Sequence, residues 1–183
     1  ASEKVPAISE AEQMKTACQN RQAVCVSLDK EKKTVKPPKL FDLTTLQREA
    51  NRTYGFTAKQ TLDYAQSLYE HKLITYPRTD SRYLTSDMAG TAADVLKLAA
   101  ELPPFAGTPA FSPDVAALLS DKDVSDHHAI IPTMEAGRAD LAALPVGERS
   151  LFLLICCKLL CAAASSHVYE AVTAVFECGG YSF

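Results

Sequence analysis

The sequence predicts a mainly helical α+β protein in which a helical domain is inserted into a small β-containing lobe. Residues 23–28 have the composition of a strand, and residues 168–177 alternate between apolar and polar side chains as a strand does. Between these runs the spacing becomes helical, with repeated capping signals. We therefore expect residues 1–38 to begin the lobe, residues 39–140 to form the helical domain and residues 141–183 to return into the lobe.

The first segment is expected to contain a helix, a strand and a linker. Ser9-Glu10-Ala11-Glu12 has the form of a capping box, which predicts a helix that ends near Gln19. The strand at residues 23–28 is followed by a charged run, residues 29–39, that contains Pro37-Pro38. This composition predicts a turn or linker.

Capping signals also divide the central part of the chain into helices. Thr44-x-x-Gln47 and Thr57-x-x-Gln60 are both capping boxes, and Gly55 between them is a helix stop, so we expect helices at about 45–54 and 57–71. Two short helices joined by a tight turn resemble a helix-turn-helix. Further helices are predicted from Thr85 or Ser86 to about residue 102, at residues 113–120 and at residues 147–165.

Charge is distributed unevenly along the chain. The 183 residues carry a formal net charge of -3. Residues 30–82 have eleven Lys or Arg against six Asp or Glu, a local balance of +5 that leaves -8 for the remainder. A basic segment suits a phosphate backbone. A solvated lysine-rich surface would explain the same charge.

Neither a membrane segment nor a metal or disulfide framework is predicted. The longest apolar run, residues 151–164, is interrupted by Lys158 and is shorter than the ~20 residues that cross a bilayer, so it is expected to be a buried helix. No secretory leader opens the sequence. The six cysteines show no paired CxxC spacing. Cys157 and Cys161, one helical turn apart, are expected to pack in the core in a reducing cytoplasm.

The segment Leu73 to Leu84 carries the clearest chemical signal. Pro77 favours an extended backbone at Tyr76, and residues i and i+2 of an extended segment point to the same side, so Tyr76 and Arg78 are expected to face one target. A phenol with a pKa near ~10 is a poor nucleophile, and a fixed cation both favours the phenolate and stabilises charge on a phosphoryl oxygen. The pair suits attack on a phosphodiester. A proline turn with a half-buried tyrosine is the structural alternative.

Several ordered motifs resemble those of type IA DNA topoisomerases, most closely the topoisomerase III branch. The resemblance rests on residues 37–51 (PPKLFDLTTLQREAN), 55–62 (GFTAKQTL), 65–70 (AQSLYE), 73–84 (LITYPRTDSRYL) and 126–133 (DHHAIIPT). It implies the helical domain of the type IA toroid inserted into its arch, or hinge, lobe. It also implies that Tyr76 attacks single-stranded DNA and becomes joined to the 5' phosphate, after which a strand passes and the break is religated without ATP.

The resemblance implies further site residues. Arg78 corresponds to the arginine that contacts the scissile phosphate, and His127 to a histidine that hydrogen bonds near it. The DNA contacts expected beside Arg78 are His128, Ser81, Arg82, Lys59 and Phe56. Helix capping or solvent exposure would account equally well for Ser81, Arg82 and Lys59, and packing of the helix turn is the favoured structural role for Phe56. No residue of this chain is predicted to ligate a metal.

Family members also carry an N-terminal toprim domain whose acidic residues bind Mg2+, and no such acidic triad follows a strand in this sequence. We therefore expect this chain to be a piece of a longer enzyme, inactive or nearly so alone, with Mg2+ held by the toprim domain. The implied partner is single-stranded DNA. We expect a monomer that is associated with DNA in the bacterial cytoplasm, without a membrane partner, and a helicase partner is left open. A non-catalytic module in which Tyr76 stacks on a base is the alternative.

Overall fold

The computed structural model of the protein describes residues 7–107 and 112–183. The chain divides into two units. Both ends of the chain form the first unit, up to Val35 and from His167, and Lys36–Ser166 form the second. The combination of helices with a three-stranded antiparallel sheet confirms the predicted α+β class.

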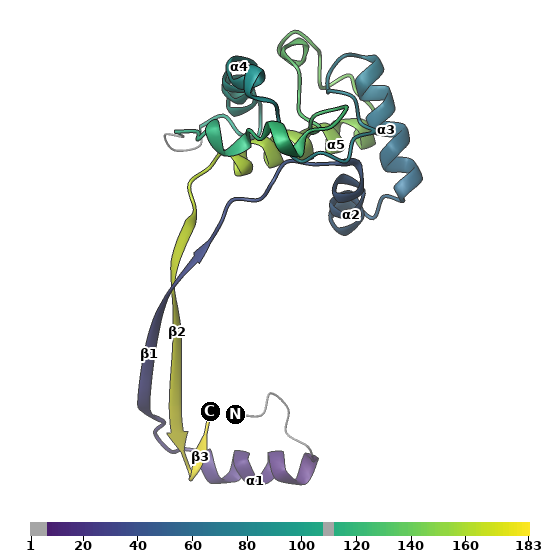
Figure 1. The fold of residues 1–183 in the computed structure, drawn as a ribbon. Coiled ribbons are helices and arrows are strands. Elements are labelled where there is room, and N and C mark those ends of the chain that lie inside the picture. The colour runs from purple at the N-terminus through teal and green to yellow at the C-terminus, as the bar shows by residue number, and fades with distance from the viewer. Residues whose placement is uncertain (1–6, 108–111) are drawn as a thin grey trace. The chain divides into compact units, whose positions relative to one another are not determined.

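The first unit is a long β ribbon with a helix beside one end (Figure 1). Strands β1 (Val24–Val35) and β2 (His167–Cys178) pair antiparallel from Val24↔Glu177 to Val35↔His167, and β3 (Tyr181–Ser182) pairs with the end of β2. Helix α1 (Ile8–Cys18) precedes β1. At Gly179, which has φ +60°, a Cβ would lie 2.4 Å from the main-chain oxygen of Ala17. Glycine therefore permits the β2–β3 turn to approach the end of α1 this closely.

Two sequence predictions for this unit are wrong. Residues 29–35 are not a linker, because they continue β1 and pair with residues 167–173 of β2. Every residue of β1 is exposed, so its charged side chains remain in water while the main chain is paired. The predicted capping box at Ser9 does not form either. Helix α1 begins at Ile8 and its N-cap, Ala7, makes no side-chain capping bond.

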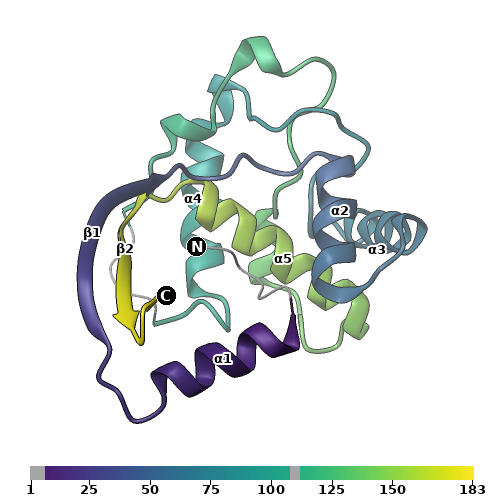
Figure 2. The same ribbon diagram turned by 90° about the horizontal axis from the view of Figure 1, so that it is seen from below.

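In the second unit the described residues, 36–107 and 112–166, form four α-helices with short 3-10 turns between them. They are α2 (Leu43–Tyr54), α3 (Ala58–Glu70), α4 (Ala89–Glu101) and α5 (Val146–Ala162), with turns η1 (Ser86–Met88), η2 (Ala116–Leu118), η3 (Asp121–Asp123) and η4 (Met134–Gly137). Helix α5 contacts α2, α3 and α4, and Figure 2 shows it between α4 and the α2–α3 pair. Its fully buried residues Leu151, Phe152 and Ile155 lie in the core of the unit.

Helices α2 and α3 form the predicted pair, but only one of the two predicted capping boxes is present. Thr57 and Gln60 cap α3 reciprocally. At α2 the box is formed by Asp42 and Thr45, two residues earlier than Thr44-x-x-Gln47. Gly55 ends α2 with φ +73°, a left-handed conformation that favours glycine.

The C-terminal boundary and a short helix differ from the sequence-based expectation. We expected residues 141–183 to return into the β lobe, whereas α5 lies in the helical unit because its apolar residues pack into that core. The predicted helix at residues 113–120 is only the single turn η2.

Only one cysteine of α5 is in the core. Cys156 is buried, whereas Cys157 and Cys161 are exposed, contrary to the expectation that they pack inside. Burial raises the pKa of Cys156 to about 12. A hydrogen bond from the Cys157 thiol lowers the pKa of Cys161 to about 6, with a further contribution from Lys158.

We expect Cys161 to react first with a thiol reagent. The thiolate is the nucleophile, so its alkylation rate should be half-maximal near pH 6, the pKa given above, and should level off at higher pH. Iodoacetamide labelling over a pH series, read by peptide mass spectrometry, measures this profile. Cys157→Ala removes the donor and should move the profile to higher pH, whereas Cys157→Ser retains a donor. An unchanged profile in Cys157→Ala would contradict the assignment.

Candidate active site around Tyr76

The segment that carries Tyr76 is held in place by pairing with residues 129–133. The main-chain N–H of Thr75 donates to the oxygen of Ile131 at 2.9 Å, and its hydroxyl donates to the oxygen of Ala129 at 3.1 Å. Leu73 and Ile74 are buried in the core of the second unit. The segment is non-helical, as Pro77 predicts, and Tyr76 lies directly beyond this anchored part.

Tyr76 lies between two aromatic rings. The centroid of its ring is 4.5 Å from that of His127, with a tilt of 50°, and 5.4 Å from that of Tyr69, which meets it edge-on. Tyr76 is half-buried and His127 is exposed. These contacts bring the predicted nucleophile and the predicted histidine together from segments about fifty residues apart.

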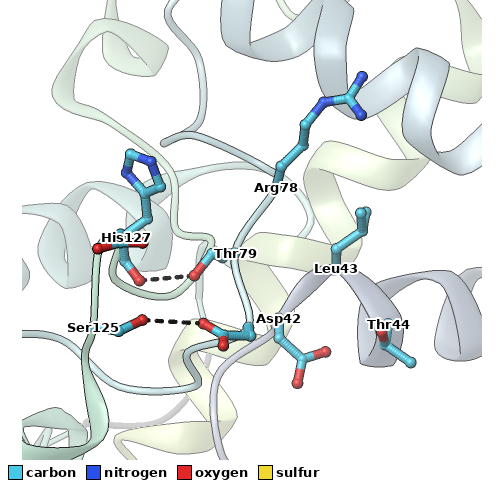
Figure 3. Close-up of a pocket in the computed structure, with 9 residues that line it drawn as sticks. Asp42, Leu43, Thr44, Arg78, Thr79, Ser125 and His127 are labelled. Carbon is cyan, nitrogen blue, oxygen red and sulfur yellow. Dashed lines mark hydrogen bonds between the residues drawn. The ribbon is translucent and has the colours of Figure 1, made fainter.

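A cavity of about 490 Å³ lies beside these residues. It is lined by Asp42, Leu43, Thr44, Arg78, Thr79, Asp80, Ser125, Asp126 and His127. Two hydrogen bonds join the segments around it: the buried Thr79 hydroxyl donates to the main-chain oxygen of His127 at 2.8 Å, and the N–H of Leu43 donates to the oxygen of Thr79 at 3.1 Å. Figure 3 shows Arg78 and His127 extending away from the Asp42 carboxylate.

Arg78 and His127 line this cavity, whereas Tyr76 is not among its lining residues. His127 links the two residues, because it contacts the Tyr76 ring and also lines the cavity beside Arg78. Arg78 is exposed, and among residues 7–107 and 112–183 it has no ion pair or hydrogen-bond partner. Its guanidinium is free to meet an anion.

The carboxylates at the cavity have local partners. Asp42 accepts the N–H and hydroxyl of Thr45 as the cap of α2, and Asp80 is 3.5 Å from the Ser125 hydroxyl. Across the part of the chain that the structure describes, no three His, Cys, Asp or Glu side chains are grouped so that they could hold a metal ion. The described residues therefore do not fit a Mg2+ site.

Two of the other predicted DNA contacts have local roles in the fold. Ser81 is buried, and its hydroxyl donates to the main-chain oxygen of Asp123 at 2.9 Å. The Nδ1 of the half-buried His128 is 2.9 Å from the oxygen of Ala129. Each side chain is therefore tied to the main chain by at least one hydrogen bond.

The remaining three predicted contacts lie outside the cavity. Lys59 is exposed and pairs with Asp63 one turn along α3 at 2.6 Å. Phe56 is half-buried between the rings of Tyr54 and Tyr64, each 5.3 Å away, and so packs the α2–α3 turn. Arg82 lies in the same extended segment as Tyr76, and its Nε donates to the oxygen of Leu40 at 3.2 Å.

Sequence reasoning missed Tyr69 and Thr79. Tyr69 is 39% exposed, and its ring meets that of Tyr76 edge-on. Its place in the last turn of α3, seven residues before Tyr76, was the available signal. Thr79 gave no signal, because its partner His127 is distant in the sequence.

The chain belongs to the DNA topoisomerase family, whose model matches residues 1–183. It is 42% identical over 175 residues to DNA topoisomerase 3 of Bacillus subtilis (strain 168), covering 90% of this chain and 23% of that protein. The corresponding enzyme of Bacillus licheniformis is 43% identical over 177 residues, covering 93% and 24%. These relatives confirm the predicted resemblance. The chain spans about a quarter of their length.

The fold also matches a solved structure. Full-length topoisomerase I from Thermotoga maritima aligns with a TM-score of 0.65 and 26% identity over 94% of this chain and 28% of that one. Among the described residues, no helix is long and apolar enough to cross a membrane.

Proposed function

We propose that this chain supplies the cleavage tyrosine of a type IA DNA topoisomerase. In this proposal the Tyr76 oxygen attacks a phosphodiester of single-stranded DNA. The bond between phosphorus and the 3' oxygen breaks, the phenol proton leaves, and the 3' oxygen takes up a proton. Tyr76 is then joined to the 5' phosphate, and reversal of the exchange reseals the strand without ATP.

The observation that carries the proposal is the contact between Tyr76 and His127, next to a cavity that His127 and Arg78 line. A strand whose phosphate lies between Tyr76 and this cavity would meet an unpaired guanidinium and an exposed imidazole. Arg78 would stabilise the negative charge that develops on the phosphoryl oxygens. His127 would hydrogen bond to the same phosphate.

The same proposal covers the rest of the reaction. Mg2+ and proton transfer belong to a toprim domain of the full-length protein, and the 183-residue chain alone has little or no cleavage activity. The full-length protein acts as a monomer on single-stranded DNA in the bacterial cytoplasm, where strand passage changes DNA topology.

His128, Arg82 and Lys59 are secondary contacts to the strand. Phe56 and Ser81 contribute only by holding the fold.

Tyr76→Phe in the full-length protein is expected to abolish a denaturant-stable DNA adduct. Single-stranded oligonucleotides labelled at the 5' or the 3' end are incubated with protein and Mg2+, then separated under denaturing conditions. The wild-type adduct should retain the 3' label, because Tyr76 holds the 5' phosphate of the downstream piece. Tyr69→Phe is the matched control, since it removes the neighbouring phenol oxygen while the ring remains, and it should still form the adduct.

Two results would overturn the proposal. An adduct that retains the 5' label would mean attachment to a 3' phosphate. DNA binding without any adduct would make the protein a non-catalytic binding module in which the rings of Tyr76 and Tyr69 stack on bases.

A further inference from the structure

A second cavity, of about 300 Å³, lies in the helical unit and shares no lining residue with the cavity beside Arg78. Three of its lining residues are basic: Lys36, Lys39 and Arg82. The others are Pro37, Pro38, Leu40, Tyr83, Ala117, Leu118, Ala162 and Ser166. Within the described part of the chain no acidic residue lines it, so its field is positive in a protein with a net charge of -3.

Two of the three cations are oriented by the fold. The Nε of the half-buried Arg82 donates to the main-chain oxygen of Leu40 at 3.2 Å, which fixes the plane of the guanidinium. Its two terminal nitrogens have no partner within residues 7–107 and 112–183. The Nζ of Lys39 lies over the Tyr83 ring, 4.8 Å from its centroid. A planar guanidinium with two free nitrogens matches phosphate geometry.

The cavity lies along the same two segments that bear the candidate active site. Leu43 is bonded to Thr79, and Leu40 is bonded to Arg82, so the two segments run in opposite directions beside each other. From Thr79 to Arg82 is three residues, or ~10 Å of extended chain. This spacing corresponds to a few nucleotides of a strand that enters or leaves the Tyr76 site.

We propose that Lys36, Lys39 and Arg82 form a binding site for a backbone phosphate of single-stranded nucleic acid, separate from the scissile phosphate. The inference rests on the proposed function, because that function supplies the strand. The basic side chains bind the phosphate, and the apolar wall formed by Pro37, Pro38 and Leu118 faces the sugar. Among the described lining residues, Tyr83 and Ser166 have the only polar side chains besides the cations, so the site recognises charge and not base sequence.

The test uses Lys36→Ala/Lys39→Ala in the full-length protein. Both lysines are exposed, whereas Arg82 is bonded to the main chain and its removal could disturb folding. Anisotropy of a labelled single-stranded oligonucleotide is measured over a range of salt concentrations. Loss of two phosphate contacts should lower the affinity and reduce the slope of log K against log salt by ~1.4, or ~0.7 per contact.

Lys97→Ala/Arg138→Ala is the matched control. It removes two positive charges from α4 and from the end of η4 in the same unit, and both residues are exposed. This variant should leave the salt slope unchanged. An equal reduction in both variants would overturn the site, since it would show only a general effect of charge.

Two further measurements separate the possible failures. If the double lysine variant loses affinity for inorganic phosphate but binds the oligonucleotide as wild type does, the cavity binds free anions and the proposal is wrong. The Tyr76 adduct assay is run in parallel. An adduct with an unchanged salt slope overturns this site and leaves the proposed function standing, whereas a reduced slope without an adduct supports the site and overturns the function.

Discussion

Replacement of Arg78 by alanine is expected to slow formation of the Tyr76–DNA adduct by about 10²–10³-fold, the effect of removing one charge-stabilising donor from a transition state. Arg78 is exposed and has no partner among the described residues, so its loss should change the free energy of unfolding by less than ~0.5 kcal/mol. A large kinetic effect with almost no effect on stability would distinguish a chemical role from a structural one.

Single-turnover adduct formation at saturating oligonucleotide measures this effect. Arg78→Lys is the matched variant, since it retains the charge but loses the planar fork that pairs with two phosphoryl oxygens. We expect it to fall between wild type and alanine. If Arg78→Ala weakened DNA binding but cleaved bound DNA at the wild-type rate, Arg78 would be a binding residue and its assignment as stabiliser of the transition state would be wrong.

The parts of the fold that the sequence predicted well depend on short-range interactions. The Thr57–Gln60 capping box and the left-handed Gly55 involve residues at most three positions apart, so the local pattern determines them. Pro77 likewise excludes helix at Tyr76 by its own geometry. In the candidate site, sequence motifs predicted Tyr76, Arg78 and His127. The structure adds the contact between the rings of Tyr76 and His127.

The parts that the sequence did not predict depend on distant partners. The charged run of residues 29–35 becomes strand because residues 167–173 pair with it, and no local pattern contains that information. Helix α5 packs with α2, α3 and α4 for the same reason. Tyr69 could be recognised as a contact of Tyr76 only once the turn at the end of α3 was known.

Phe152→Ala is expected to lower the free energy of unfolding by about 3–5 kcal/mol, the range for truncating a buried phenylalanine. Phe152 is fully buried on α5, in the same core that holds Leu73 and Ile74 just before Tyr76. The cavity left behind would remove the van der Waals contacts between the Phe152 ring and its neighbours in the core. Urea unfolding followed by circular dichroism measures the change.

Val146→Ala is the control for this measurement, because Val146 begins the same helix but is 69% exposed. It should change the free energy of unfolding by less than ~0.5 kcal/mol. Equal effects of the two substitutions would show that α5 contributes helix propensity and not core packing. A large effect of Phe152→Ala alone would mean that α5 supports the Tyr76 segment through this shared core, although it contributes no residue to the cavity beside Arg78.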